Sequence, residues 1–272
     1  MLRLSAADAL LTIEPERGGR ITSLVVAGRE LLMWERFRTI DWGSYPMAPF
    51  AGRLRDARFM FDGRAIQLPA TEGPHAIHGT TLDRPWRIED DRTISIDLGD
   101  PWPFAGRVTQ GYELEPGRLR QTMRLDAVDP MPAVIGWHPW FVRRPRLVSE
   151  ARAGEPEHLT APLELQFGAE RMLQRDADGL PTGHRLSPPP PPPWDDAFEG
   201  VVSGPTLRWP GFLELSIESD ASHWVVYTHD EDGIAVEPQT GPPDGPNLEP
   251  RIVGPGTPLT IEMTWRWRDL TG

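Results

Sequence analysis

The sequence predicts an all-β protein, built as a single large antiparallel β-sandwich with little helix. Three observations lead to this prediction. Apolar and polar residues alternate along many short stretches, 31 prolines and 26 glycines separate those stretches, and no long stretch has a helical period. Sandwiches of roughly 200–250 residues often form one domain. Because no change in composition resembles a linker, we expect one domain over residues 1–272.

Two hairpins are expected in the first quarter of the chain. Residues 23–27 and 30–34 are apolar runs around a glycine, and residues 58–61 and 64–68 flank Asp62-Gly63. The Asp-Gly dipeptide favours a tight two-residue turn, because both positions adopt positive φ at low cost. The segments of each pair are therefore expected to be antiparallel neighbours.

Further strands are indicated by alternation with a period of two. They are expected at residues 94–98, 108–114, 119–125, 212–217, 224–227 and 259–267. The six prolines Pro188–Pro193 favour a polyproline II segment. Such a segment is either a ligand for a proline-binding domain or a stiff connector, and we expect a connector that places residues 194–196.

Composition and charge exclude several classes of function. The net charge of −12 argues against an electrostatic grip on nucleic acid or an anionic membrane. The absence of cysteine excludes disulfides, thiolate nucleophiles and zinc–sulfur sites, and the absence of lysine excludes a Schiff base. No stretch approaches the ~20 apolar residues that span a bilayer, and the N-terminus lacks the apolar core of a signal peptide. We expect a cytoplasmic protein, as a monomer or a homodimer.

The segment most suggestive of chemistry is 135–141, which reads Ile-Gly-Trp-His-Pro-Trp-Phe. Pro139 disfavours a helical conformation at His138, so His138 is expected in extended chain or a turn. Aromatic rings on both sides can wall a pocket in which an imidazole exchanges protons near neutral pH. A simpler interpretation is a partly buried core histidine with a satisfied hydrogen bond.

Two further charged residues occur in unusual surroundings. Glu237 ends the apolar run 234–236, so its carboxylate is expected at a strand end, where partial burial raises its pKa and makes it a usable base. Arg53 lies just before the Asp62-Gly63 hairpin. Each of these residues could equally form an ordinary ion pair.

Two other clusters of titratable residues have no clear function from the sequence. His75 and His78 lie in a stretch rich in turn residues, and their spacing is only a weak indication of a metal site. Asp195 and Asp196 lie between aromatic residues, where a turn cap is the simpler reading. We expect no metal at these residues.

Together and in this order, these segments resemble the aldose 1-epimerase (mutarotase) family over most of the chain, from about Pro15 to Trp267. The likeness is carried by five elements: Gly52-Arg53-Leu54 with the hairpin after it, His75 to Gly79, Gly136 to Phe141, Asp195 three residues before Phe198, and Val236 to Thr240 running on to Asn247. The resemblance implies a twisted β-sandwich with an open cleft on one sheet. It also implies interconversion of the α and β anomers of a free aldose, a small monosaccharide, without any cofactor.

The resemblance assigns roles to six residues. Glu237 is implied as the base at the C1 hydroxyl and His138 as the acid at the ring oxygen. The implied sugar-binding residues are His78, Arg53, Asp195 and Trp140, the last as an aromatic wall for which Trp137 and Trp194 are alternatives.

The sequence departs from the family pattern in the residues expected to contact the sugar. Gly52 replaces a usual asparagine, Thr80 a usual glycine, and Trp140 a usual tyrosine. Arg143 and Arg144 suggest a phosphorylated sugar, and hence a hexose-phosphate 1-epimerase, although Pro139 is unusual for that group. The sequence is also compatible with a non-catalytic carbohydrate-binding β-sandwich, and with a glycoside hydrolase that uses the two carboxylates of Glu237 and Asp195.

Overall fold

The computed structural model describes residues 1–148, 159 and 161–271. Most of these residues are in strands, as the sequence predicts. The strands of the first half are β1 (Leu2–Ala6), β2 (Ala9–Glu14), β3 (Arg20–Val26), β4 (Arg29–Glu30), β5 (Ser44–Met47), β6 (Arg53–Leu54), β7 (Arg58–Phe61), β8 (Arg64–Gln67), β9 (Ala76–Ile77), β10 (Arg87–Ile88), β11 (Thr93–Asp97), β12 (Gly106–Glu115), β13 (Arg118–Ala127) and β14 (Met131–Pro132). The strands of the second half are β15 (Gly136–Val142), β16 (Glu164–Arg175), β17 (Pro181–Leu186), β18 (Asp195–Trp209), β19 (Leu213–Ser219), β20 (His223–Tyr227), β21 (Gly233–Gln239), β22 (Ile252–Val253) and β23 (Leu259–Asp269).

Helix is confined, among the described residues, to four short pieces. The 3₁₀ turns are η1 (Pro15–Arg17), η2 (Thr39–Asp41) and η3 (Arg55–Ala57), and the α-helix is α1 (Gly245–Leu248). None of these helices is long and apolar enough to cross a membrane.

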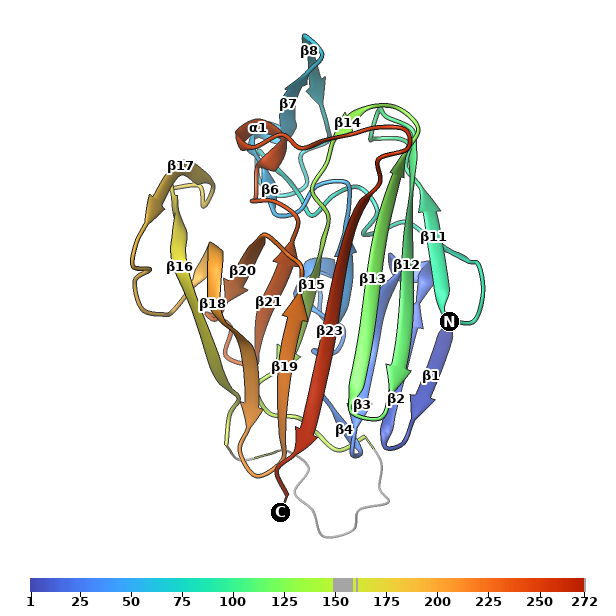
Figure 1. The fold of residues 1–272 in the computed structure, drawn as a ribbon, viewed down its shortest axis with the longest axis vertical. Helices are drawn as coiled ribbons and strands as arrows, with labels where there is room; N and C mark the ends of the chain where they lie inside the picture. The colour runs from blue at the N-terminus through green and yellow to red at the C-terminus, as the bar shows by residue number, and fades with distance from the viewer. Residues whose placement is uncertain (149–158, 160, 272) are drawn as a thin grey trace.

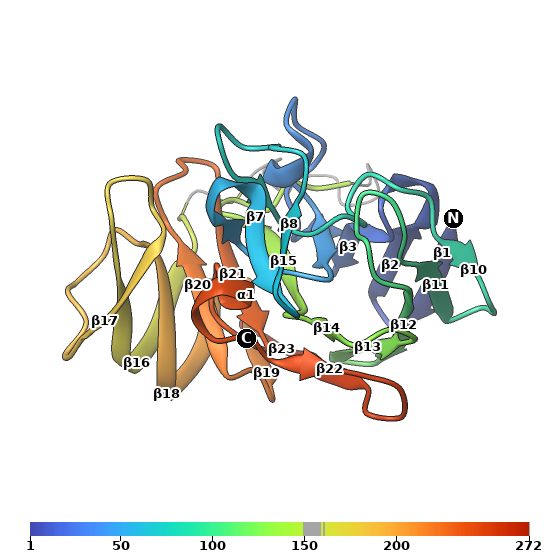
Figure 2. The same cartoon turned by 90° about the horizontal axis from the view of Figure 1, so that it is seen from above.

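One curled antiparallel sheet of 17 strands forms both layers of the sandwich. The front layer of Figure 1 runs from β10 through β11, β12, β13 and β23 to β19. The back layer runs from β1 through β2, β3, β5, β15 and β21 to β20. Figure 2 shows the two layers from above. The fold class and the antiparallel sandwich predicted from the sequence are thus confirmed.

Strand β18 joins the two layers. Its first residues, from Asp195 to Glu199, pair with β20 in the back layer, and its last residues, from Thr206 to Trp209, pair with β19 in the front layer. Strands β16 and β17 extend from β18 at the edge of the sheet (Figure 1). The sheet therefore turns the corner within one long strand.

The core lies between the layers. Apolar residues on the inner faces of both layers pack there with little or no exposure, including Leu11 and Leu24 from the back and Leu125, Met263 and Trp265 from the front. The alternation of β13 and β23 thus gives each strand one core face. That core fixes the back layer, whose other face carries the candidate site.

The hairpin predicted around Asp62-Gly63 forms as expected, whereas the one predicted from residues 23–27 and 30–34 is shorter, with only Val25 and Val26 paired to Glu30 and Arg29. Residues of β3 pair with β4, and all four residues of β7 pair with β8 around Asp62-Gly63, both of which have positive φ. The strands expected at residues 94–98, 108–114, 119–125, 212–217, 224–227 and 259–267 correspond to β11, β12, β13, β19, β20 and β23. Strands β1, β2, β5 and β16 to β18, together with several two-residue strands, were not predicted.

Candidate functional site

The candidate site is built on a row of cross-strand neighbours in the back layer. In the ladder between β15 and β21, Gly136 pairs with Gln239 and Trp140 with Ala235, so the register places His138 opposite Glu237. Side chains directly opposite each other in an antiparallel pair are close neighbours. Their contact is therefore fixed by strand pairing and not by a loop.

Alternation along β15 decides which aromatic residues reach the site. His138 and Trp140 share the face that lines a cavity, whereas Trp137 and Phe141 point into the core. Trp137 donates its indole N–H to Gln110 inside that core, at 2.9 Å. Trp137, one of the aromatic walls considered from the sequence, therefore does not line the cavity.

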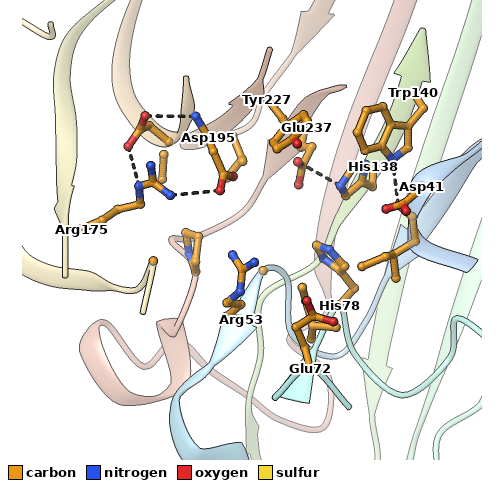
Figure 3. A pocket seen from close by; sticks show the side chains of 18 of the residues that line it. Asp41, Arg53, Glu72, His78, His138, Trp140, Arg175, Asp195, Tyr227 and Glu237 are labelled. Carbon is orange, nitrogen blue, oxygen red and sulfur yellow. Dashed lines mark hydrogen bonds and ion pairs between the residues drawn. The ribbon is translucent and has the colours of Figure 1, made fainter. Parts of the chain in front are cut away.

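The contact between His138 and Glu237 is direct. Nε2 of His138 lies 3.1 Å from Oε1 of Glu237, and both side chains are almost fully buried. The other carboxyl oxygen, Oε2, accepts a hydrogen bond of 3.2 Å from the side-chain amide of Gln239. Both atoms of the carboxyl group are thus held at the floor of the cavity (Figure 3).

Burial controls the protonation of this pair. Desolvation, with the nearby charge of Asp195 as a lesser cause, raises the pKa of Glu237 well above its usual range. Desolvation, with His78 as a lesser cause, lowers the pKa of His138 well below its usual range. Both pKa shifts favour the uncharged forms, a protonated carboxyl and a neutral imidazole, and in these forms the pair carries one proton.

Two aromatic rings enclose the imidazole of His138. Tyr45, which β5 places opposite His138, stacks on the imidazole with ring centroids 4.8 Å apart and an interplanar angle of 22°. Trp140 stacks on it at 5.4 Å and 23°. The hydroxyl of Tyr45 and the indole N–H of Trp140 both donate to the carbonyl oxygen of Ile40, at 2.9 and 2.8 Å. We call this arrangement of Tyr45, Trp140 and the Ile40 carbonyl the aromatic clamp.

The clamp matters because no hydrogen bond with a described group orients the imidazole at Nδ1. Nδ1 of His138 is buried and has no hydrogen-bond partner among the described residues. Histidines that exchange protons are commonly oriented by a hydrogen bond at this second nitrogen. In this site the two stacked rings, with the Nε2 contact to Glu237, hold the orientation.

The wall facing this floor comes from the short β6–β9 ribbon and the turn after it. His78 follows β9 with a φ of 57°, and its ring meets that of His138 edge-on at 4.9 Å. Burial lowers the pKa of His78 to about 3, so its ring is neutral near neutral pH. A Cβ on Gly79 would lie 2.0 Å from the carbonyl oxygen of Ala48, so only glycine fits after His78.

Arg53 and Asp195 lie on the opposite side of the cavity from Trp140 (Figure 3). No described side chain makes a hydrogen bond or ion pair with the guanidinium of Arg53, which points into the cavity. Asp195 accepts a hydrogen bond of 3.0 Å from Arg175, whose Nε also donates to Asp196 at 2.7 Å. Desolvation raises the pKa of Asp195 despite these arginines.

All six residues proposed from the sequence therefore line one cavity of about 340 Å³. They are His138, Glu237, His78, Arg53, Asp195 and Trp140. Sequence reasoning missed several polar lining residues, which are Arg38, Asp41, Glu72, Arg175, Tyr227 and Asp230. Tyr45 of the clamp was missed as well, because only strand pairing reveals it.

Two other expectations from the sequence, for Trp194 and for Arg143, are corrected by the structure. Trp194 does not line the cavity but packs on Phe167 and Phe198. Arg143 donates to the carbonyl oxygens of Asp230 and Thr228, at 2.9 and 2.8 Å, and so does not present its guanidinium to the cavity. Among the described residues no group of three His, Asp or Glu side chains is placed to hold a metal ion.

Comparison with known proteins identifies the family. The model of the aldose 1-epimerase family matches residues 1–195. The chain belongs to this family. A protein of Escherichia coli K12, YphB, itself uncharacterized, is 29% identical over 120 residues. That match covers 42% of this chain and 41% of the relative, so the chain matches less than half the length of this curated relative.

Solved structures of similar fold cover nearly the whole chain. A candidate aldose 1-epimerase from Escherichia coli K12 has a TM-score of 0.80 at 21% identity, with 99% of each chain covered. A galactose mutarotase-like protein from Clostridium acetobutylicum also scores 0.80, at 17% identity over 98% of this chain and 94% of that one. Galactose 1-epimerase from Lactobacillus acidophilus scores 0.75 at 17% identity, covering 98% and 93%. These likenesses establish the fold shared with this family.

Proposed function

We propose that the protein interconverts the α and β anomers of a free, neutral aldose, with Glu237 as the base and His138 as the acid. The observation that supports this most is the 3.1 Å contact between Nε2 of His138 and Oε1 of Glu237 at the floor of an open cavity. Ring opening of a hemiacetal needs one base at the C1 hydroxyl and one acid at the ring oxygen. Two groups this close can serve both atoms of one C1–O5 unit.

The reaction conserves protons at each step. Glu237 removes the proton of the C1 hydroxyl, the C1–O5 bond breaks to give the aldehyde, and His138 gives its proton to O5. The open chain then rotates about the C1–C2 bond and presents the other face of the carbonyl. On closure O5 attacks C1 and returns its proton to His138, while O1 recovers its proton from Glu237.

The single proton of the pair prepares it for this reaction. The base must be a carboxylate and the acid an imidazolium, which together carry the same single proton as the uncharged pair. Transfer of that proton from Glu237 to His138 across 3.1 Å converts one form into the other. The hydroxyls of a bound sugar stabilise the charged form by hydrogen bonding.

The charges around the cavity favour a neutral sugar over a phosphorylated one. Among the described residues that line it, three are arginines and six are acidic: Arg38, Arg53 and Arg175 against Asp41, Glu72, Asp195, Asp196, Asp230 and Glu237. Arg38 and Arg175 are already paired with acidic side chains. A phosphate dianion would meet a surplus of negative charge.

The test is anomer exchange measured by NMR on freshly dissolved α-hexoses and pentoses. Glu237→Gln should slow the exchange by roughly 10²–10⁴-fold, the usual contribution of a positioned acid or base. The matched control is Glu164→Gln, which makes the same substitution at an exposed residue of β16 and should not change the exchange rate.

Other results would assign another function. Near-full activity of Glu237→Gln would exclude Glu237 as the base. Sugar binding without any acceleration by the wild-type protein would indicate a carbohydrate-binding protein. New reducing ends from an oligosaccharide would indicate a hydrolase.

A further inference from the structure

A second cavity, of about 450 Å³, adjoins the candidate active site. Four residues line both cavities: Arg38, Ile40, Glu72 and Ile77. Where they meet, Nη2 of Arg38 and Oε2 of Glu72 form an ion pair of 2.7 Å between partly exposed side chains. Exposed ion pairs of this kind are weak and open readily to other hydrogen-bonding groups. A ligand larger than one ring can therefore occupy both cavities.

The lining of the second cavity suits a neutral ligand with both apolar and hydroxyl surface. Its charges balance, because Arg38 and Arg84 stand against Glu72 and Asp83. The remaining lining mixes hydroxyl side chains with apolar ones, namely Thr39, Thr71 and Thr80 with Phe37, Phe50, Leu68, Pro69, Leu82 and Pro101 among others. A sugar ring has this combination, since its hydroxyls project mainly from the edge of the ring and its C–H groups form apolar faces.

Phe37 adds an exposed aromatic ring at this cavity. Its side chain lines the second cavity but not the first, and it is fully exposed to solvent. A single exposed apolar side chain is ordinary on a protein surface, so Phe37 counts here because it borders the cavity, where a bound sugar ring could cover it.

We propose that the second cavity is a subsite for a second neutral sugar unit, so that the preferred substrate is an oligosaccharide with a free reducing end. The inference rests on the proposed function. The reducing unit lies at Glu237 and His138, and its glycosidic link to the second unit leaves its C1 hydroxyl free. No bond to the second unit is made or broken, and this unit contributes binding alone.

The test compares kcat/KM of anomer exchange for a free hexose and for reducing disaccharides that carry it at the reducing end. At least one disaccharide should exceed the free hexose. Phe37→Ala should lower the disaccharide value roughly tenfold, the scale expected for one buried aromatic contact, and leave the free-hexose value unchanged. Phe37→Tyr keeps the ring and should restore the disaccharide value. Val202→Ala, which removes an exposed apolar residue outside both cavities, is the control.

The results separate this inference from the proposed function. Acceleration of hexose exchange with no disaccharide advantage, or an equal effect of Phe37→Ala on both substrates, would overturn the subsite and leave the function intact. Preference for an acylated aldose over every disaccharide, lost in Phe37→Ala, would show that the cavity takes an apolar substituent and would also overturn the proposal. No acceleration with any sugar would overturn both.

Discussion

The aromatic clamp predicts that Tyr45 affects the rate of reaction through its ring and not through its hydroxyl. Tyr45 is fully buried and stacks on His138, and burial raises the pKa of its phenol well above the usual range, so the hydroxyl stays protonated. Tyr45→Leu removes the flat surface against the imidazole and keeps a buried apolar side chain. Tyr45→Phe keeps the ring and removes only the hydrogen bond to the carbonyl of Ile40.

The expected magnitudes follow from these contacts. A stacked aromatic pair contributes about 0.5–1.5 kcal/mol beyond its buried area. If that energy holds His138 in the reactive orientation, Tyr45→Leu lowers kcat by roughly 2- to 13-fold. In Tyr45→Phe the Ile40 carbonyl still accepts from Trp140 at 2.8 Å, so the cost is a lost hydrogen bond of about 0.5–1 kcal/mol in stability.

The assay is anomer exchange at saturating and at limiting sugar, together with thermal unfolding of each variant. Tyr45→Leu should lower kcat with little change in KM, because Tyr45 does not line the cavity. Tyr45→Phe should retain most of kcat with a slightly lower Tm. A folded Tyr45→Leu with the full wild-type kcat would refute the clamp. An equal loss in both variants would show that the hydroxyl matters and the stacking does not.

Three further predictions concern the charges of the site. Activity should fall at both low and high pH. At low pH the His138–Glu237 pair takes up a second proton and has no base, and at high pH it loses its only proton and has no acid. A flat kcat/KM profile over the pH range in which the protein stays folded would contradict this. Glu237→Gln should raise Tm relative to wild type increasingly as pH rises above about 4.3, since a carboxyl with a raised native pKa contributes stability below its unfolded pKa of about 4.3 and loses that stability as pH rises; calorimetry at several pH values checks the slope, and a constant difference would argue against the raised pKa. Arg53→Met should raise KM by roughly tenfold with little change in Tm, because its guanidinium makes no hydrogen bond or ion pair with a described side chain; an unchanged KM, measured by the same exchange assay, would exclude Arg53 from sugar binding.

Much of the sandwich was predictable because local pattern and tertiary structure agree over most strands. Strands β12, β13 and β23 alternate cleanly, since each has one face in the core, and the β7–β8 turn has the dipeptide that its geometry requires. Strand β16 was missed because its pairing with β18 shifts register around Gly168, which breaks the period of two. Strand β18 was missed because it passes from one layer to the other, so no single alternation runs along it.

The candidate site was only partly predictable, for a related reason. The motif around His138 and the run before Glu237 indicated two residues with suitable chemistry, and strand register brought them into contact. No local pattern marks Tyr45 or Arg175, because their neighbours in the site come from strands distant in the sequence. Trp140 was proposed from the resemblance, and the structure adds that Trp137, on the other face of β15, points into the core.

The candidate site is divided between paired strands, which carry His138 and Glu237, and loops, which line the second cavity. This division suggests how the groups proposed for chemistry and those that contact a ligand can change independently. His138, Glu237 and Tyr45 lie on three adjacent strands of the back layer, where a shift of one residue would turn His138 into the core. His78 lies in a turn, and the second cavity is lined by loop residues such as Phe37 and Thr80. Loops tolerate substitution more readily than paired strands. The departure from the family pattern at Thr80 lies in the second cavity and not in the one that His138 and Glu237 line.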